Sequence, residues 1–519
     1  MAGTILRSFR NTQRALLSSP FPLCTSITTN HSSSRNSGSP SSITTPFSSS
    51  VANMTTTAPS SVSATSSSTT TAAVKESVIR KMTRLAHQYG AVNLSQGFPN
   101  EPPPRKLRLA LAHSVLTGQE VTAKTTSSPI TSSTPQSYQE YHEDELQQAL
   151  LNVLQQQQQQ SKEEGNAPFT ESADVLNQYS PPMGRADLRQ GIADYYKRFY
   201  NYQVSPDDVT VTLGATEAFA SALRTVGRPG DKCVILEPFH EIYPSQCRIF
   251  FMEPLYVTLR EDGERWTYDK QEFQQALSQA KILMLNSPHN PTGKVFSRDE
   301  LAEIVGWCQQ YNVTIITDEI YEHMCFGEEK HILIPQEFPE VAHQTLVCNS
   351  LGKSASATGW RLGWALHPPH LRETYRGIHD QMAVMSPHPM QYAALLYTSL
   401  PDAYFKELAT RYHGRVQMLA TVLQHVGFRV VFPQGAYYLF VNYRNVPALQ
   451  DKDSMEAAMY LLREIGVACV PGDNFYGSSN DGQNYLRFAA CRSDSDLEEA
   501  SRRLQKLTHV SLPSSGSSK

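Results

Sequence analysis

Short apolar runs alternate with amphipathic stretches through the middle of the chain. Each run holds four or five residues, and segments with helical spacing separate one run from the next. Apolar runs of this length between turn signals are typical of strands that are buried on both faces of a parallel sheet. The predicted strands are residues 209–213, 233–236, 282–285, 313–316 and 345–348.

A different pattern begins near residue 368. Helical spacing dominates at first, and short apolar strands then precede a final helix at 497–507. The other predicted elements are helices at 373–385, 391–398 and 403–426 and strands at 437–441 and 485–490. This organisation predicts an α/β fold with a large domain at 176–367 and a smaller α/β domain at 368–508. Residues 76–117 are expected to form an N-terminal arm and part of the smaller domain.

Three stretches lack the composition of a packed core. Residues 1–75 contain no Asp or Glu, and Ser and Thr make up more than half of residues 41–75. Residues 118–175 combine a Ser/Thr-rich segment with six consecutive glutamines, which indicates a disordered surface insertion, because lengthening a loop adds little closure entropy. A disordered leader is predicted at 1–75 and a disordered tail at 509–519.

The leader has the composition of a targeting segment. Arg7, Arg10 and Arg14 share one helical face in an acid-free stretch, which is typical of an organelle transit peptide. The arginine spacing favours a mitochondrial destination, although the long Ser/Thr tract would also suit a plastid. A plain disordered tail is the alternative, and an internal start at Met54 would give a cytoplasmic form.

Composition excludes several classes of protein. The chain has 519 residues, a formal net charge of -4 and 40% hydrophobic residues, so it can bury a large core. The eight cysteines form no Cys-x-x-Cys pair, which argues against a zinc ribbon and favours a reducing compartment. We expect no metal site, no membrane span and no nucleic-acid partner, because no ligand cluster, long apolar run or basic block is present.

Chemically active side chains follow the predicted strands. In an open α/β sheet, ligands bind beyond the carboxyl ends of the strands, so these side chains should line one crevice. The residues in question are His240, Asn290, Asp318, Tyr321, Ser350 and Lys353. A glycine turn before Ala215 and Thr216 opens a predicted helix, and the amino end of a helix suits a phosphate group.

Lys353 stands in the most distinctive stretch of the chain. Residues 349–363 predict a strand, a tight turn and a second strand, and small residues surround the lysine. Gly352, Lys353 and the following Ser, Ala, Gly, Arg, Leu and Gly positions resemble the lysine signature of class I aminotransferases that use pyridoxal phosphate (PLP). The resemblance covers residues 76–117 and 176–508. It implies fold-type I, with a mostly parallel, seven-stranded type of sheet flanked by helices.

The same resemblance implies the roles of individual residues. Lys353 would be the catalytic residue, which bonds to the cofactor and then moves the substrate α-proton. The implied cofactor-binding residues are Ala215, Thr216, His240, Asn290, Asp318, Tyr321, Ser350, Lys353, Arg361 and Tyr179, the last reaching the neighbouring subunit of a homodimer. The implied substrate-binding residues are Gly97, Asn290 and Arg487.

The implied reaction is a ping-pong transfer of an amino group from an L-amino acid to a 2-oxo acid. Residues 94–99 and 287–296 are similar to those of the kynurenine, glutamine and methionine aminotransferases. The side-chain pocket would hold Ile79, Thr216, Met385 and Ser386, fewer aromatic residues than kynurenine-specific relatives carry. Methionine or an aliphatic donor is therefore a credible substrate, and the sequence gives no sign of a dedicated site for a dicarboxylate.

Two other classes of function use the same residues. A PLP-dependent lyase, either a cysteine-conjugate β-lyase or a cyclopropane-forming synthase, would act on a different substrate bond. A non-catalytic PLP-binding protein is the second alternative. The complete set of Lys353, Asp318, Asn290, Tyr321 and Arg487 argues against a degenerate site, and analysis of the products would separate transfer from elimination.

Overall fold

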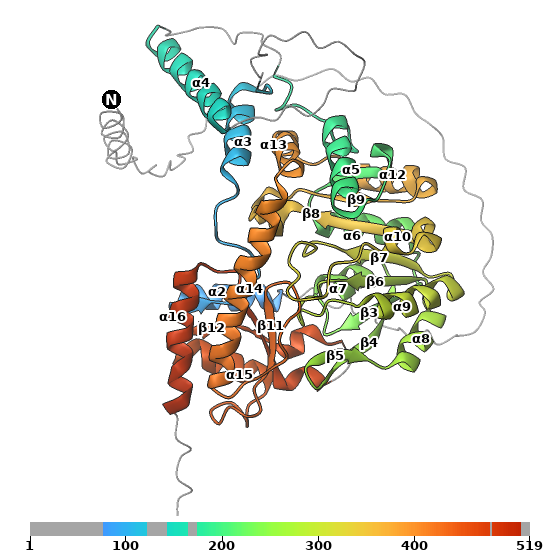
Figure 1. The fold of residues 1–519 in the computed structure, drawn as a ribbon, viewed down its shortest axis with the longest axis vertical. Coiled ribbons are helices and arrows are strands. Elements are labelled where there is room, and N and C mark those ends of the chain that lie inside the picture. Colours follow the sequence, from blue (N-terminus) through green and yellow to red (C-terminus); the bar gives the residue numbers. More distant parts are fainter. Residues whose placement is uncertain (1–75, 122–142, 164–173, 478–479, 510–519) are drawn as a thin grey trace, which may run out of the picture. The chain divides into compact units, whose positions relative to one another are not determined.

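The computed structural model describes residues 76–121, 143–163, 174–477 and 480–509 (Figure 1). The chain divides into two units, Met1–Ala72 and Ala73–Lys519, and all described residues belong to the second. The predicted leader, and the predicted tail beyond residue 509, lie outside the described residues. The second unit contains a larger and a smaller domain.

An eight-stranded mixed sheet forms the centre of the larger domain. Its order is β2-β9-β8-β7-β6-β3-β4-β5, and all its strands except β9 and β5 run in the same direction. The strands are β2 (Val209–Thr212), β3 (Lys232–Glu237), β4 (Glu253–Asp262), β5 (Arg265–Tyr268), β6 (Ile282–Asn286), β7 (Thr314–Asp318), β8 (Thr345–Ser350) and β9 (Gly363–Leu366). The α/β class and the five predicted strands are therefore confirmed, while the β4–β5 hairpin makes the sheet larger than the seven-stranded type.

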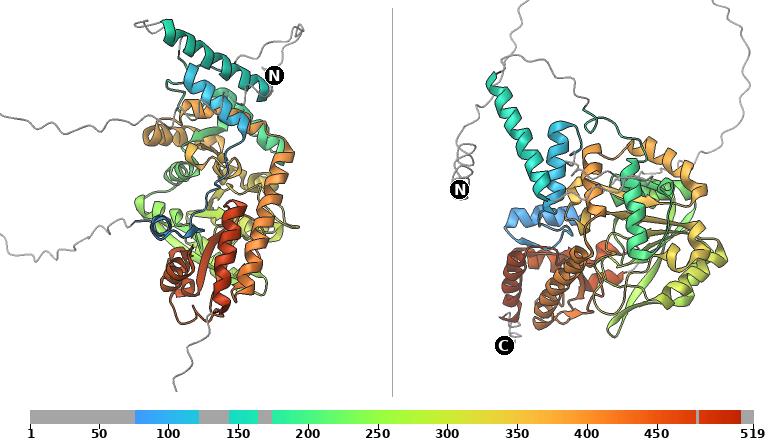
Figure 2. Two further views of the ribbon diagram at one scale, coloured as in Figure 1. Left: turned by 90° about the vertical axis from the view of Figure 1, so that its left-hand side faces the viewer. Right: turned by 45° about the horizontal axis from the view of Figure 1, so that its top comes forward.

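Burial explains why these segments form strands. All residues of β2, β6 and β8 are buried, so apolar side chains are needed on both faces. Helices cover the sheet (Figures 1 and 2). They are α5 (Ala186–Tyr200), α6 (Ala215–Val226), α7 (Ile242–Ile249), α8 (Lys270–Ser278), α9 (Arg298–Tyr311), α10 (Ile334–Glu337), α12 (Arg372–Ala383) and α13 (His388–Thr398).

The smaller domain surrounds a four-stranded sheet of order β10-β11-β14-β13. The strands are β10 (Arg429–Val430), β11 (Tyr438–Asn442), β13 (Val470–Pro471) and β14 (Tyr485–Ala489). Its helices are α2 (Val78–Tyr89), α14 (Asp402–His425), α15 (Ser454–Tyr460) and α16 (Asp494–Leu504). The N-terminal arm joins this domain through β1 (Val92–Asn93), which pairs in parallel with β12 (Val467–Ala468).

The smaller domain begins later than residue 368. Helix α12 packs on α6, and α13 packs on α5 and on α3 (Arg105–Thr117), so both helices lie with the larger domain. The small-domain contacts begin with α14, which packs against α16, β10 and β11. The predicted boundary was wrong because a change in periodicity marks a change of element, and the packing partner of a helix cannot be read from its spacing.

The predicted disorder of the insertion is wrong for residues 143–163. These residues form helix α4 (Glu143–Glu163), which packs against α3. Leu146 is fully buried, and Arg105 of α3 donates hydrogen bonds to Glu143 at 3.1 Å and to Gln147 at 2.5 Å. The other parts of the insertion, 122–142 and 164–173, lie outside the described residues.

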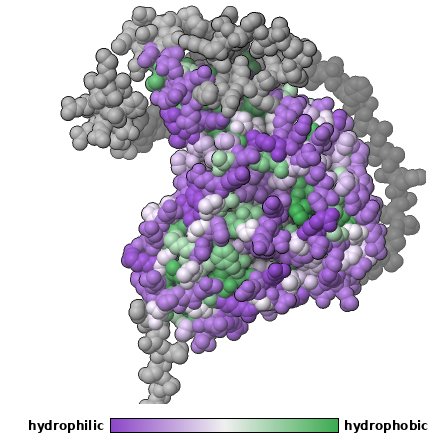
Figure 3. All heavy atoms as spheres, viewed as in Figure 1, coloured by the Kyte–Doolittle hydropathy of each residue, from purple (hydrophilic) through white to green (hydrophobic). Residues whose placement is uncertain are grey.

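Polar residues dominate the surface in the view of Figure 3, with apolar residues in patches between them. None of the helices that the structure describes is long and apolar enough to cross a membrane. The seven cysteines of the described ranges are all free.

Candidate active site

Lys353 lies just beyond the carboxyl end of β8, in the short helix α11 (Leu351–Ser354). Its Nζ donates a hydrogen bond to the carbonyl oxygen of Gly97 at 2.6 Å. Burial lowers the pKa of the Lys353 amine to about 8, and the charges of Arg487 and Arg361 act in the same direction. The uncharged, nucleophilic fraction of the amine at neutral pH is therefore roughly a few hundred times larger than in an ordinary lysine, although most of the amine is still protonated.

Asp318 ends the neighbouring strand β7 and is 1% exposed. Burial raises the pKa of its carboxyl to about 7, although hydrogen bonds from the Tyr243 hydroxyl and the Ile320 N–H favour the ionised form. Such a carboxylate gains most from a buried cationic partner, because the pairing replaces the water that the carboxylate has lost. Tyr243 was not predicted from the sequence, and its place on α7, beside His240, is the signal that could have identified it.

Arg487 on β14 lies beside Asn290, which follows β6. Its Nη1 donates to Asn290 Oδ1 at 3.0 Å, and its Nη2 donates to the Ser95 carbonyl at 2.9 Å. The side chain is 1% exposed and lies over the rings of Tyr438 and Phe475, 4.4 and 4.8 Å from their centroids. Its Nε has no hydrogen-bond partner, and no carboxylate of the described residues forms an ion pair with it. A buried guanidinium in this state suits a carboxylate ligand.

Tyr321 and Gly97 both contact a pair of neighbouring tyrosines, Tyr437 and Tyr438. The Tyr321 hydroxyl lies 3.0 Å from the hydroxyl of Tyr438, and the Gly97 carbonyl accepts a hydrogen bond from Tyr437 at 3.2 Å. A Cβ atom on Gly97 would lie 1.8 Å from the Tyr438 hydroxyl oxygen, so only glycine fits here. The peptide between Asn290 and Pro291 is cis.

The amino end of α6 forms a second part of the site. Gly214 has a φ of 75°, and a Cβ there would lie 2.7 Å from Arg361 Nη2. The first-turn N–H groups of Ala215 and Thr216 have no partner inside the helix, and the helix dipole favours a negative charge at this end. Arg361 also donates a hydrogen bond to the Leu213 carbonyl at 3.3 Å, so its guanidinium lies beside the amino end of α6. Ser350 ends β8, three residues before Lys353.

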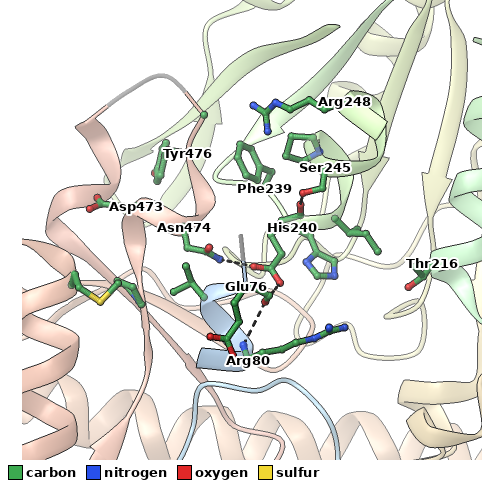
Figure 4. Close-up of a pocket in the computed structure, with 18 residues that line it drawn as sticks. Glu76, Arg80, Thr216, Phe239, His240, Ser245, Arg248, Asp473, Asn474 and Tyr476 are labelled. Carbon is green, nitrogen blue, oxygen red and sulfur yellow. Dashed lines mark hydrogen bonds between the residues drawn. The ribbon is translucent and has the colours of Figure 1, made fainter. Parts of the chain in front are cut away.

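His240 borders a cavity of about 910 Å³ beside these groups (Figure 4). Burial lowers the pKa of its imidazole to about 3, and the charges of Arg487 and Lys353 lower it further. The ring is therefore neutral, and its buried Nδ1 has no hydrogen-bond partner. Thr216 also lines the cavity, whereas Lys353, Asp318 and Arg487 do not.

Some predicted residues lie apart from this group. Tyr179 is 81% exposed and lies outside this group. Ile79, Met385 and Ser386 do not line the cavity. Met385 Sδ instead accepts a hydrogen bond from the Ser180 N–H at 3.0 Å.

These groups fit a planar cofactor that carries an aldehyde, a basic ring nitrogen and a phosphate. Lys353 supplies an amine of lowered pKa, Asp318 supplies a buried acid that lacks a cationic partner, and Arg361 with the α6 terminus supplies an anion cradle. The buried Nδ1 of His240 is also without a hydrogen-bond partner. Among the described residues, no group of three or more His, Cys, Asp or Glu side chains could hold a metal ion.

Comparisons with known proteins agree with this chemistry. The family model described as aminotransferase class I and II matches residues 137–504. A probable kynurenine–oxoglutarate transaminase of Saccharomyces cerevisiae is 32% identical over 358 residues, which are 64% of this chain and 80% of that protein.

Solved structures with the same fold include the N-succinyldiaminopimelate aminotransferase of Mycobacterium tuberculosis, with a TM-score of 0.69 and 30% identity over 83% of this chain and 97% of that one. YbdL of Escherichia coli, for which a methionine aminotransferase function is described, has a TM-score of 0.68 and 25% identity over 84% of this chain and 98% of that one.

Proposed function

The chain belongs to the class I and II aminotransferase family, and on this premise we propose that it transfers the amino group of an L-amino acid such as methionine, glutamine or kynurenine to a 2-oxo acid. Members of the family depend on PLP, and the chain is a fold-type I transaminase. The proposal concerns its substrates and the role of each residue.

The observation that carries the proposal is the environment of Lys353. A buried amine with a pKa near 8, beside a buried acid and a buried arginine, supports a role in both covalent bonding and proton transfer. When bound, PLP supplies an aldehyde that bonds to amines and a ring that accepts electrons. Released from the cofactor, Lys353 would take the proton from the substrate α-carbon as a base and deliver it, as an acid, to the cofactor carbon that carried the aldehyde.

The other residues would hold the cofactor. Asp318 would face the ring nitrogen and keep it protonated, Asn290 and Tyr321 would bind the phenolic oxygen, and the neutral His240 ring would stack on the cofactor. The proposed phosphate-binding residues are Ala215, Thr216, Ser350 and Arg361, with Tyr179 from a second copy of the chain.

Arg487 would bind the substrate carboxylate with its planar fork, beside Asn290 and Gly97. This role is supported by the buried guanidinium, whose unpartnered Nε and lack of an ion pair suit an incoming anion. The carboxylate would then fix the α-carbon within reach of Lys353. The names of the relatives, which concern kynurenine, N-succinyldiaminopimelate and methionine, support transfer over elimination and leave the donor to be measured.

We also propose that the chain is a homodimer and that residues 1–75 direct it to mitochondria, with a plastid or an internal cytoplasmic start as the alternatives. The exposed Tyr179 supports the dimer. The arginine face of the leader supports mitochondrial targeting.

The test is a half-reaction. Purified protein loaded with PLP is mixed with single L-amino acids without an oxo acid, and the cofactor absorbance and the product are measured together. A donor should bleach the aldehyde form and release one equivalent of its 2-oxo acid, and Lys353→Ala should abolish this while the circular dichroism spectrum stays unchanged. Release of pyruvate and a thiol from a cysteine conjugate, without any such bleaching, would instead support the β-lyase.

A further inference from the structure

An arginine without a partner lines the cavity beside the active site. Arg80 lies in the first turn of α2, and Figure 4 shows its side chain below His240 and directed toward Thr216. Its backbone N–H donates to the Ser77 hydroxyl at 3.4 Å. Within the described ranges, its guanidinium forms no hydrogen bond or ion pair with any side chain.

The other charged groups of the cavity wall are already paired or lie elsewhere. Glu241 accepts hydrogen bonds from the Ser77 hydroxyl at 2.5 Å and from Asn474 at 3.2 Å. Glu76 forms an ion pair with Arg84 at 3.1 Å.

Arg248 donates to the Tyr256 hydroxyl at 2.8 Å. Asp473 lies on the other side of Asn474 from His240 in Figure 4. Arg80 is therefore the cation of this wall that remains available to a ligand near His240.

His240 connects this arginine with the catalytic groups. Its ring lies 5.7 Å from the ring of Tyr243, whose hydroxyl donates a hydrogen bond to Asp318, so His240 stands between the cavity and the catalytic groups. The neutral ring adds no charge of its own to the cavity. The cavity that His240 and Arg80 both line has a volume of about 910 Å³, which accommodates a small molecule.

We propose that Arg80 binds the distal carboxylate of a dicarboxylic substrate, in particular the 2-oxo dicarboxylic acid that accepts the amino group, and so determines the preferred acceptor. The inference rests on the proposed function. No sign of such a dicarboxylate site was evident in the sequence, because an arginine on an exposed helix face carries no signal of its own.

The first experiment compares two acceptors that differ only at the distal end, 2-oxoglutarate and 2-oxopentanoate, with one fixed amino donor. Arg80→Gln should raise KM for 2-oxoglutarate by about tenfold or more, the loss expected for a charged hydrogen bond. The kcat values and the KM for 2-oxopentanoate should stay within twofold. The control Arg248→Gln removes an arginine of the same wall that is already bound to Tyr256 and should leave both KM values within twofold.

The second experiment measures binding without turnover. Glutarate and pentanoate are titrated into the PLP-loaded protein while the cofactor absorbance is followed. Wild type should bind glutarate at least tenfold more tightly than pentanoate, and Arg80→Gln should remove this difference.

Equal losses for both acceptors, or an unchanged preference in Arg80→Gln, would overturn the role of Arg80 while leaving aminotransfer intact. If no donor released an oxo acid, the proposed function would fail, and the glutarate titration would still decide whether Arg80 binds a carboxylate.

Discussion

The pKa of the Lys353 amine is lowered because the amine is buried in a narrow space. Gly97 lies against its Nζ, and a side chain at that position would collide with Tyr438. The resulting burial shifts the pKa of the amine from 10.5 to about 8. A single glycine in the N-terminal arm therefore contributes to the chemistry of a lysine in the larger domain.

Covalent uptake of PLP should follow this pKa. The uncharged amine is the nucleophile, so the uptake rate of the apoprotein should rise with pH and level off with a midpoint near 8. Stopped-flow absorbance over pH 6 to 11 measures the rate, and Lys353→Ala serves as the blank. A midpoint above 10 would mean that the amine is not shielded from water in the apoprotein.

Asp318 should make the apoprotein sensitive to pH. Its folded pKa of about 7 lies above the ordinary value of 3.8, so its contribution to the free energy of unfolding is full below pH 4 and declines until pH 7. Between pH 5 and 7.5, wild type should therefore lose at least about 1.4 kcal/mol more stability than Asp318→Asn, since one pKa unit corresponds to that energy. Urea unfolding of the two apoproteins at both pH values measures the difference, and parallel changes would contradict the raised pKa.

At the scale of elements, a buried network of hydrogen bonds around Glu322 connects the segments that carry the site residues. Glu322 Oε1 accepts hydrogen bonds from Tyr195 at 2.5 Å and from Asn349 at 2.6 Å, and Oε2 accepts one from Tyr200 at 2.6 Å. Asn349 Oδ1 in turn accepts from the Ser350 N–H at 2.7 Å. Glu322 thus joins α5, the loop after β7 and the end of β8, which carry the cofactor-binding groups.

Glu322→Gln should loosen this junction. An amide replaces one acceptor oxygen with a donor, so at least one of the three hydrogen bonds is lost, at a cost of about 2 kcal/mol in the free energy of unfolding. PLP should also bind more weakly, because Ser350 is held through Asn349. Thermal unfolding and PLP titration measure the two effects, and the exposed Glu340→Gln is the matched control. Identical behaviour of the two variants would show that the network does not support the site.

The predictable elements are those whose own side chains decide their structure. The strands at 282–285 and 345–348 are apolar because they are buried on both sides, so their composition identifies them. Helix α4 was missed because its run of glutamines resembles a disordered segment, although Leu146, Leu150 and Leu154 have helical spacing, and its packing depends on the contact of Leu146 with α3. Two features of the site could not be predicted, because each brings together segments that are far apart in the sequence, and a local pattern does not encode such contacts. One is the hydrogen bond from Arg487 to Ser95, and the other is the position of Arg80 in the cavity wall.

Helix α4 should be removable from its partner without loss of activity. Leu146→Asp places a charge in its buried contact, so α4 should detach from α3 and become sensitive to protease. Because α4 contributes no residue to the site, kcat should stay within twofold. Limited proteolysis with an activity assay tests both statements, and loss of PLP binding would show that the insertion supports the catalytic domain.

At the scale of the whole molecule, the proposed homodimer would complete the site with Tyr179 of a second copy of the chain. Tyr179 is 81% exposed, and Val175 nearby is 56% exposed. Light scattering of the purified full chain should give twice the mass of 57.9 kDa. Tyr179→Phe should weaken PLP binding about tenfold through the lost phosphate hydrogen bond and leave the dimer intact. A monomer with full PLP affinity would contradict the shared site.

The parallel pairing of β1 with β12 has a consequence for synthesis. Val92 pairs with Val467, so the arm that carries Gly97 has no strand partner until the ribosome has made most of the chain. Contacts between such distant segments form late, after the central sheet has collapsed. The nascent chain is thus inactive during translation, and the catalytic centre closes only when the last strands have emerged.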